Sequence, residues 1–205
     1  MNENVLTKEQ SALAGKLLPE LKDFYLVGGT ALALQIGHRR SVDFDLASRR
    51  PIDSFELERH LISKGFQIQR IFTATGDEYS ALIQKVKITF FHFPFDVGHP
   101  LSWEKGNITL PSIKDLAAMK AYALGRRSKW KDYVDLYFVL KSYMELEDLI
   151  QRAKGIFSVH FNSKLFREQL CYFDDMDYSE SIEYLGQAPR DEEVRNFLEK
   201  TAVAI

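Results

Sequence analysis

Two aspartates separated by one phenylalanine are the residues of this chain best suited to chemistry. Asp43 and Asp45 flank Phe44 in the segment SVDFDLAS, where apolar and polar residues alternate as in a β-strand. Residues two apart in a strand point to the same side, so both carboxylates are predicted to project from one face and to favour a bound cation. Mg²⁺ binds one or two carboxylates and completes its octahedron with water and phosphate oxygens. The alternative is that the aspartates only line a solvated sheet face.

A glycine pair precedes these aspartates. Gly28 and Gly29 follow the apolar run DFYLV and open the segment TALALQIG, which predicts a strand, a turn and a short helix ending at Gly37. Glycines let the backbone approach a ligand, free N–H groups at a helix N-terminus bind anions, and Thr30 adds a hydroxyl there. Together with the aspartates, this predicts a triphosphate-binding turn beside a pair of metal-binding carboxylates, as nucleotidyl transfer requires. A purely structural turn is the alternative.

The elements that must position these residues change in type along the chain. Before about residue 110, helix and strand patterns are mixed: Thr7 begins a capping box with Gln10, and Asp53 opens a helix that ends at Gly65. After Pro111 only helix patterns are found. Further predicted strands are FQIQRIFTA, EYSALIQ, VKITFFHFPF and NITLPS, and the later predicted helices are SIKDLAAMKAYALG, KDYVDLYFVLK, LEDLIQRAKGIF, SKLFREQLCYF and DEEVRNFLEKTA. The sequence predicts an α+β fold, with a small mixed β-sheet domain and flanking helices over residues 1–110 and a helical domain over 111–205.

Composition limits the class of protein. The 205 residues are 45% hydrophobic and 27% charged with a net charge of −2, which is typical of a folded globular chain without a general attraction to polyanions. The single cysteine excludes an intramolecular disulfide. No apolar run approaches the roughly 20 residues that span a bilayer, and the first residues lack a leader pattern. The expected location is therefore the cytoplasm, with no membrane partner.

The order of these motifs resembles that found in a known superfamily. Val27-Gly28-Gly29, thirteen residues, and then Asp43-Phe44-Asp45-Leu46 resembles the signature of the DNA polymerase β-like nucleotidyltransferases. The longer stretch LVGGTALALQIGHRRSVDFDL resembles the AbiEii/AbiGii toxin family within it. Asp115-Leu-Ala-Ala-Met-Lys120 and Lys131-Asp132-Tyr-Val-Asp135 continue the resemblance, which spans about residues 24–140.

The resemblance implies a Mg²⁺-dependent enzyme that moves an NMP from an NTP to a hydroxyl of tRNA, another RNA or a protein. It also implies a toxin of a toxin–antitoxin or phage-defence system, with a cognate antitoxin as partner. Residues 1–110 would form the nucleotidyltransferase domain, and 111–205 would contribute to the active-site cleft. Two Mg²⁺ ions would be held by Asp43 and Asp45, the catalytic residues would be Asp43, Asp45 and Asp135, and the nucleotide-binding residues would be Gly28, Gly29, Thr30, Arg40, Lys120 and Lys131.

The later motifs also have structural explanations. Lys131, Asp132 and Asp135 can share one helix face, which could instead be an exposed face with an internal ion pair. Lys120 could be a solvated lysine. Four cations lie around Trp130 and are here called the basic loop: Arg126, Arg127, Lys129 and Lys131. This loop is predicted to bind a triphosphate or an RNA backbone, or to be an exposed connection between helices.

A third carboxylate, frequent on a later strand of this superfamily, is missing. The strand VKITFFHF has no acidic residue, and Thr89 lies about where that acid is expected. The general base is then open among Glu78, Asp96, Asp135 and metal-bound water. The main alternative is a catalytically degenerate module that binds an NTP or a partner protein, and a weaker one is an enzyme that modifies small molecules.

Overall fold

The computed structural model describes residues 1–124 and 126–204, which fall into two compact units, Met1–Ser112 and Ile113–Ile205. The first unit contains all strands of the described chain, and the second contains only helices and irregular segments. The predicted α+β fold class is confirmed.

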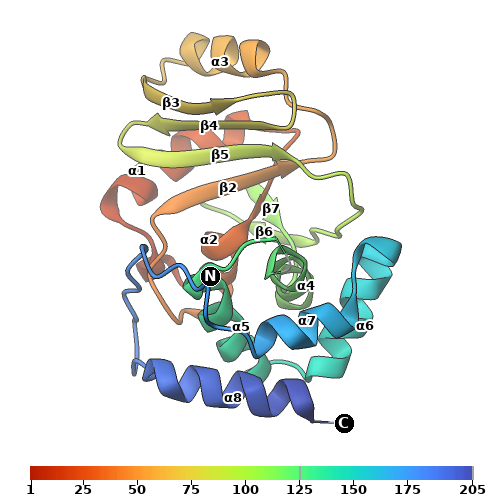
Figure 1. Cartoon of the computed structure of the whole chain (residues 1–205). Coiled ribbons are helices and arrows are strands. Elements are labelled where there is room, and N and C mark those ends of the chain that lie inside the picture. The colour runs from red at the N-terminus through yellow and green to blue at the C-terminus, as the bar shows by residue number, and fades with distance from the viewer. Residues whose placement is uncertain (125, 205) are drawn as a thin grey trace. The chain divides into compact units, whose positions relative to one another are not determined.

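The first unit is built on a five-stranded sheet with the order β1-β2-β5-β4-β3 (Figure 1). The strand β2 pairs antiparallel with β1 and parallel with β5, so the sheet is mixed. The strands of this sheet are β1 (Tyr25–Val27), β2 (Asp43–Ser48), β3 (Ile68–Ala74), β4 (Glu78–Ile83) and β5 (Val86–His92). A separate antiparallel pair is formed by β6 (Leu101–Trp103) and β7 (Ile108–Leu110), and the helices are α1 (Lys8–Leu17), α2 (Gly28–Ile36) and α3 (Ser54–Ser63).

The helix ends follow the capping residues of the sequence. Thr7 Oγ1 accepts from the backbone N–H of Gln10, and the Gln10 side chain accepts from the N–H of Thr7, which completes the predicted capping box of α1. Asp53 caps α3 by accepting from the N–H of Glu56. Gly37 closes α2 in the left-handed conformation, at φ 69°.

The two faces of the sheet differ in polarity. Phe44 and Leu46 of β2 are fully buried, as are their register partners on β5, Ile88 and Phe90. The opposite face carries Asp43 and Asp45, which are partly exposed. The alternation predicted for SVDFDLAS is therefore present, and it directs the aromatic ring into the core and the carboxylates out of it.

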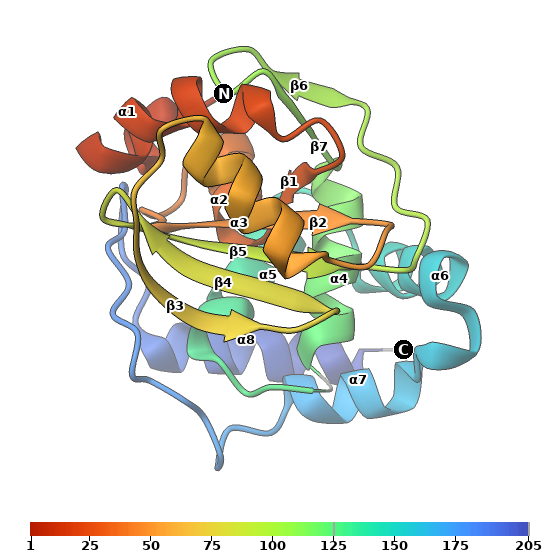
Figure 2. The same cartoon turned by 90° about the horizontal axis from the view of Figure 1, so that it is seen from above.

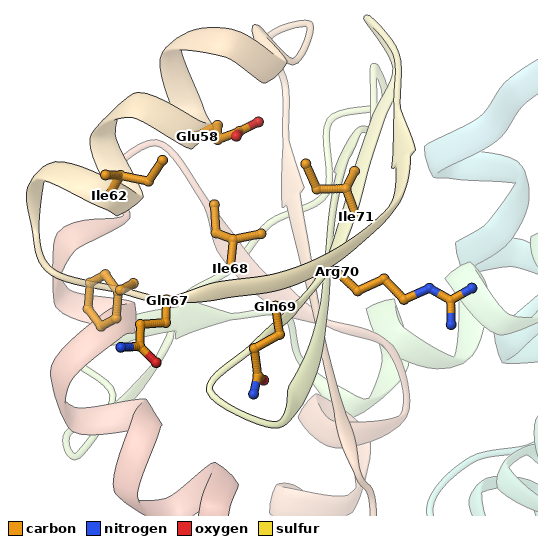
Figure 3. Close-up of a pocket in the computed structure, with 8 residues that line it drawn as sticks. Glu58, Ile62, Gln67, Ile68, Gln69, Arg70 and Ile71 are labelled. Atoms are coloured by element: carbon orange, nitrogen blue, oxygen red, sulfur yellow. The ribbon is translucent and has the colours of Figure 1, made fainter.

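The edge strand β3 is irregular. Its pairing with β4 shifts register between Ile68 and Arg70 and again between Ile71 and Thr73. A hollow of about 630 Å³ lies between β3 and α3, which runs across the sheet in Figure 2. In Figure 3 Ile68 and Ile71 face α3, whereas Arg70 points away from it.

The second unit is helical throughout its regular parts. Its helices are α4 (Ile113–Leu124), α5 (Trp130–Ser142), α6 (Leu146–Phe157), α7 (Ser163–Leu170) and α8 (Asp191–Val203). All five match segments predicted to be helical. Between α7 and α8 lies an irregular stretch, of which residues 174–183 are here called the acidic segment because they include Asp174, Asp175, Asp177, Glu180 and Glu183. Among the described residues, no helix combines the length and the apolarity that a bilayer crossing requires.

Candidate functional site

The glycine turn and the carboxylate pair meet at Gly28. This residue opens α2 directly after β1, and its φ is +70°, a conformation that L side chains rarely adopt. A Cβ at Gly28 would lie 2.1 Å from Asp45 Oδ2, so the backbone here touches the carboxylate. In the register of the sheet, Val27 lies opposite Asp45. Only glycine fits this position, because it satisfies both the backbone angle and the close approach.

The N-terminus of α2 is suited to an anion. The N-cap residue is Val27, which has no polar side chain and makes no side-chain capping hydrogen bond. The first N–H groups of a helix have no partner within it, and together with the helix dipole they attract negative charge. A phosphate held by these groups would lie beside Asp45, which is where the glycine pair and the aspartates were predicted to act together.

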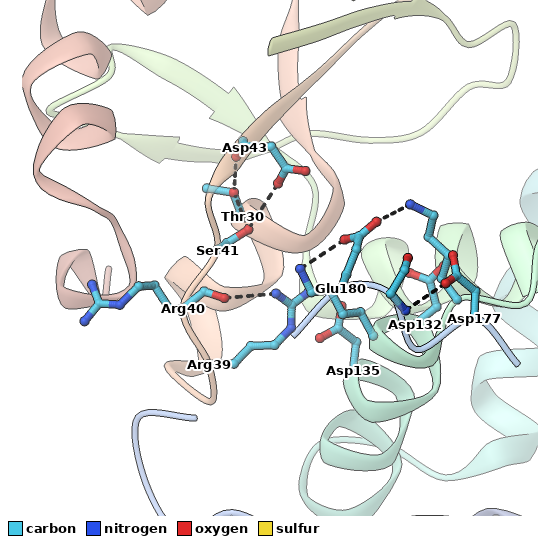
Figure 4. Close-up of polar contacts among 12 residues, drawn as sticks. Thr30, Arg39, Arg40, Ser41, Asp43, Asp132, Asp135, Asp177 and Glu180 are labelled. Carbon is cyan, nitrogen blue, oxygen red and sulfur yellow. Dashed lines mark hydrogen bonds and ion pairs between the residues drawn. The ribbon is translucent and has the colours of Figure 1, made fainter. Parts of the chain in front are cut away.

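Hydroxyl groups fix the start of β2. Thr30 Oγ1 donates to the carbonyl oxygen of Asp43 at 2.5 Å and lies 2.7 Å from Ser41 Oγ, which is 3.4 Å from Asp43 Oδ1 (Figure 4). Gln10 donates to the same Asp43 carbonyl from α1 at 3.0 Å. Thr30 is 1% exposed, and its hydroxyl is hydrogen-bonded to the backbone of β2. A phosphate at the α2 N-terminus would therefore contact the N–H group of Thr30.

The two arginines after α2 differ in position. A Cβ at Gly29 would lie 2.6 Å from Arg39 Nη2, so the second glycine makes room for a buried guanidinium. Arg39 Nη1 also donates to the carbonyl oxygen of Arg40 at 3.1 Å. Arg40 Nη1 donates to the carbonyl oxygen of Leu6 at 3.0 Å, and its side chain is directed away from Asp43 in Figure 4. The nucleotide contact expected of Arg40 stays a prediction, whereas Arg39 is beside the glycine turn.

The position next to Asp45 on β5 carries a hydroxyl. The Cα of Thr89 lies opposite Asp45 and that of Lys87 opposite Asp43. Thr89 Oγ1 is 3.3 Å from Ser80 Oγ on β4. In the described chain no three His, Cys, Asp or Glu side chains are grouped to hold a metal ion. A Mg²⁺ ion at this place would therefore rest on two carboxylates, water and phosphate, a donor set that suits this ion.

A buried charge cluster joins α4 to α5 in the second unit. Lys120 Nζ lies 2.5 Å from Asp132 Oδ1 and 2.6 Å from Asp135 Oδ2, and Arg127 Nε lies 2.8 Å from Asp132 Oδ2. Lys120, Asp132 and Asp135 are buried, so the alternatives of a solvated lysine and an exposed helix face are wrong. Burial alone would raise the pKa of Asp132, but the neighbouring charges and hydrogen bonds of Lys120 and Arg127 hold it below its ordinary value.

Asp115, which begins the motif that ends at Lys120, has a different partner. Asp115 Oδ1 lies 2.5 Å from Arg152 Nε of α6. The two motif residues, five apart on α4, therefore point to separate neighbours.

The acidic segment covers part of the basic loop. Glu180 forms ion pairs with Lys129 and with Lys131, the latter at 3.0 Å. Two backbone hydrogen bonds, from Asp177 to Ser128 and from Trp130 to Asp177, hold the segments side by side. Burial alone would raise the pKa of Glu180, but the hydrogen bonds from the two lysines lower it to about 2. No sequence pattern indicated this pairing, because its members are far apart in the chain.

Comparisons with known proteins give one consistent result. The sequence profile described as "Nucleotidyl transferase AbiEii toxin, Type IV TA system" matches residues 11–200. Uncharacterized protein aq_aa25 of Aquifex aeolicus (strain VF5) is 34% identical over 209 residues, which cover 95% of each chain. MenT4, a nucleotidyltransferase toxin from Mycobacterium tuberculosis H37Rv, matches with a TM-score of 0.63 at 16% identity, over 94% of this chain and 81% of its own. JHP933 from Helicobacter pylori matches with a TM-score of 0.56 at 20% identity, over 96% and 91%.

Proposed function

The chain belongs to the AbiEii nucleotidyl transferase toxin family, and on that premise we propose that it transfers an NMP from an NTP to a hydroxyl of an RNA or protein acceptor. The acceptor oxygen forms a bond to the α-phosphorus, the bond from that phosphorus to the bridging oxygen breaks, and pyrophosphate leaves. The observation that carries the proposal is the contact between Gly28 and Asp45, because it joins an anion-binding helix N-terminus to a carboxylate pair.

The donor triphosphate is assigned to the first turn of α2. The N–H groups of Gly28, Gly29 and Thr30 bind its oxygens, and the helix dipole adds to the attraction. Arg40 is assigned to the edge of this site. The acceptor hydroxyl loses its proton during the transfer, so a base must lie nearby.

Asp43 and Asp45 would hold two Mg²⁺ ions. When bound, these ions neutralise phosphate charge and lower the pKa of a coordinated hydroxyl or water. The chain fixes the backbone of Asp43 through the hydrogen bonds of Thr30 and Gln10 to its carbonyl oxygen, and it restricts the Asp45 carboxylate through the contact with Gly28. The backbone from which the carboxylate pair projects is therefore held in place before any ligand binds.

The roles of the second unit remain predictions. Lys120 and Lys131 are proposed to meet phosphates and Asp135 to act as the base. The ion pair with Lys120 and the complete burial of Asp135 equally suit a positioning role, in which the carboxylate orients the ammonium. Lys131 would have to exchange Glu180 for a phosphate.

A label-transfer assay tests the proposal. The chain is incubated with Mg²⁺, each of the four α-³²P-labelled NTPs, and total RNA or total protein of a bacterial host, and label transfer and pyrophosphate release are measured. Asp43→Asn and Asp45→Asn should abolish both, whereas Asp77→Asn, an acid with a 90% exposed side chain, should leave them unchanged. Full transfer by either of the first two variants would exclude the proposal.

Growth arrest is the expected cellular consequence of that transfer. Expression of the wild-type chain in a bacterial host should stop growth, expression of Asp43→Asn should not, and a cognate antitoxin should restore growth. Equal growth with both forms would argue against a toxin.

A second function is motivated by Thr89. The hydroxyl beside Asp45 stands where many relatives of this superfamily are expected to carry an acid, which would suit a module that binds an NTP or a partner without catalysis. Binding of an NTP by calorimetry, without label transfer or pyrophosphate release, would favour this module.

A further inference from the structure

Three exposed side chains form a group on the open face of the sheet. They are Arg70, Phe72 and Lys87, here called the sheet-face cluster. Arg70 Cζ lies 5.0 Å and Lys87 Nζ 5.8 Å from the centre of the Phe72 ring. Phe72 is 47% exposed, so the ring adds little to the core, and two cations lie against it.

The sheet-face cluster lies on the face of the carboxylate pair. Lys87 is the β5 residue opposite Asp43, and residues in register on neighbouring strands point to the same side. Arg70 is opposite Leu82 of β4, and Leu82 is opposite Lys87. Arg70 therefore lies in the same line of register partners across the sheet as Lys87 and Asp43. Its side chain points away from α3 in Figure 3, as this position requires.

The order of the strands places this cluster on the acceptor side. The donor triphosphate is assigned to α2, which follows β1 on one flank of β2, whereas β5, β4 and β3 continue from the other flank. In a phosphoryl-type displacement the attacking and leaving oxygens are roughly in line, on opposite sides of the phosphorus. An acceptor that attacks a phosphate at the carboxylate pair would therefore approach over β5. Strands are about 4.8 Å apart, so β3 lies about 14 Å from β2, a span of a few nucleotides at most.

We propose that the sheet-face cluster binds a single-stranded RNA end as the acceptor, with one base stacked on Phe72 and phosphates at Arg70 and Lys87; this rests on the proposed function. An exposed aromatic ring offers a face on which any unpaired base can stack, and flanking cations pair with the backbone. The net charge of −2 gives no general attraction to RNA, so binding must depend on such a local group.

Binding of a fluorescein-labelled oligoribonucleotide of mixed sequence, single-stranded or annealed to its complement, tests this by anisotropy. Phe72→Ala should weaken binding of the single strand by about tenfold or more, and Phe72→Tyr should retain it. Arg70→Ala and Lys87→Ala should each reduce the slope of log affinity against log salt by about 0.7. Phe55 is the matched control, because it is 75% exposed and has Arg59 Cζ 5.8 Å from its ring, but lies on α3; Phe55→Ala and Arg59→Ala should change nothing.

Transfer kinetics separate this proposal from the function on which it rests. Phe72→Ala should raise the KM for the RNA acceptor and leave the KM for the NTP unchanged, and Asp45→Asn should abolish transfer while retaining binding of the oligoribonucleotide. An increase in the NTP KM alone would assign Phe72 to the donor base and overturn the proposal. Equal affinity of the Phe72→Ala and wild-type chains, preference for the duplex, or no binding by the wild type would also overturn it. Cluster-dependent binding without any transfer would instead remove the acceptor role together with the proposed function.

Discussion

Gly28 shows how much a single residue without a side chain can determine. Its backbone angle and its contact with the Asp45 carboxylate both exclude a Cβ, so the turn and the carboxylate pair can be changed only together. Asp45 cannot move toward β1 without meeting the backbone, which fixes its position relative to the α2 N-terminus.

Substitution of Gly28 by alanine should therefore reduce nucleotidyl transfer by at least about a hundredfold and the free energy of unfolding by about 1–3 kcal/mol. The measurements are the label-transfer assay and urea denaturation. Gly65 is the matched control, since its φ of +81° gives similar backbone strain but no atom lies within 4 Å of its Cβ position. Gly65→Ala should lower stability and leave transfer unchanged; equal losses of transfer in both variants would contradict the role of the Asp45 contact.

The part of the site nearest to the glycine turn could be predicted from the sequence, because strand alternation and turn signals are local. Phe44 is buried and Asp43 and Asp45 face outward, as the period of two requires. The burial of Asp135 could not be predicted, because it depends on Lys120, which reaches it from another helix. The burial of Arg39 beside Gly29, in contrast to the outward course of Arg40, is a tertiary feature that no spacing rule contains.

At the scale of elements, the charge cluster of Lys120, Asp132 and Asp135 is the polar connection between α4 and α5. Its carboxylates are almost fully buried and need the ammonium to remain charged. A cation at this place is therefore required for the two helices to pack as they do.

Lys120→Met should lower the free energy of unfolding by about 3 kcal/mol, because it leaves two buried carboxylates without this cation. Urea denaturation followed by circular dichroism is the measurement. Lys164→Met is the control: Lys164 forms an exposed pair with Glu168 on α7, and its loss should change stability by no more than about 0.5 kcal/mol. A similar effect of both changes would show that the buried cluster contributes no more than a surface pair.

The acidic segment should respond to pH through Glu180. Its pKa is lowered from 4.5 to about 2, so its ion pairs are complete above pH 4.5 and are lost as the pH falls toward 2. Hydrogen exchange of the segment, corrected for intrinsic rates, should then rise across that interval. Glu180→Gln should raise exchange already at pH 7 and reduce the pH dependence, whereas Asp174→Asn, at an exposed acid of the same segment, should behave as wild type. An unchanged pH profile in Glu180→Gln would assign the transition to another group.

Elements whose signals are close together in the sequence could be predicted, whereas contacts between distant residues could not. The caps at Thr7 and Asp53 and all five later helices could be predicted, because their signals lie within a few residues. The strand β6, Leu101–Trp103, was not predicted. The acidic segment has no regular structure, and its contacts with the basic loop join residues about 50 positions apart, such as Lys129 and Glu180.

At the scale of the whole molecule, each compact unit has its own buried tryptophan. Trp103 lies in the first unit, where its indole N–H donates to Glu3 at 2.9 Å, and Trp130 lies in the second, stacked with Tyr133. Fluorescence of the two residues can therefore report on the two units separately.

Lys120→Met should shift the unfolding midpoint reported by Trp130 and leave that reported by Trp103 unchanged. Two chains are compared in urea, one with Trp103→Phe and one with Trp130→Phe, each with and without the lysine substitution. The effect should be confined to one probe because the charge cluster belongs to the core of one unit. Equal shifts of both probes would mean that the chain unfolds as a single cooperative body.

The irregular edge of the sheet has a consequence for behaviour at high protein concentration. The two register shifts of β3 interrupt the regular row of backbone groups that a strand from another molecule would need for pairing. Ile71 and Phe72 are exposed on this strand, and a straight edge with such residues would invite intermolecular sheet growth. The register shifts are therefore expected to keep this apolar, aromatic edge from seeding aggregation, which light scattering at rising protein concentration would measure.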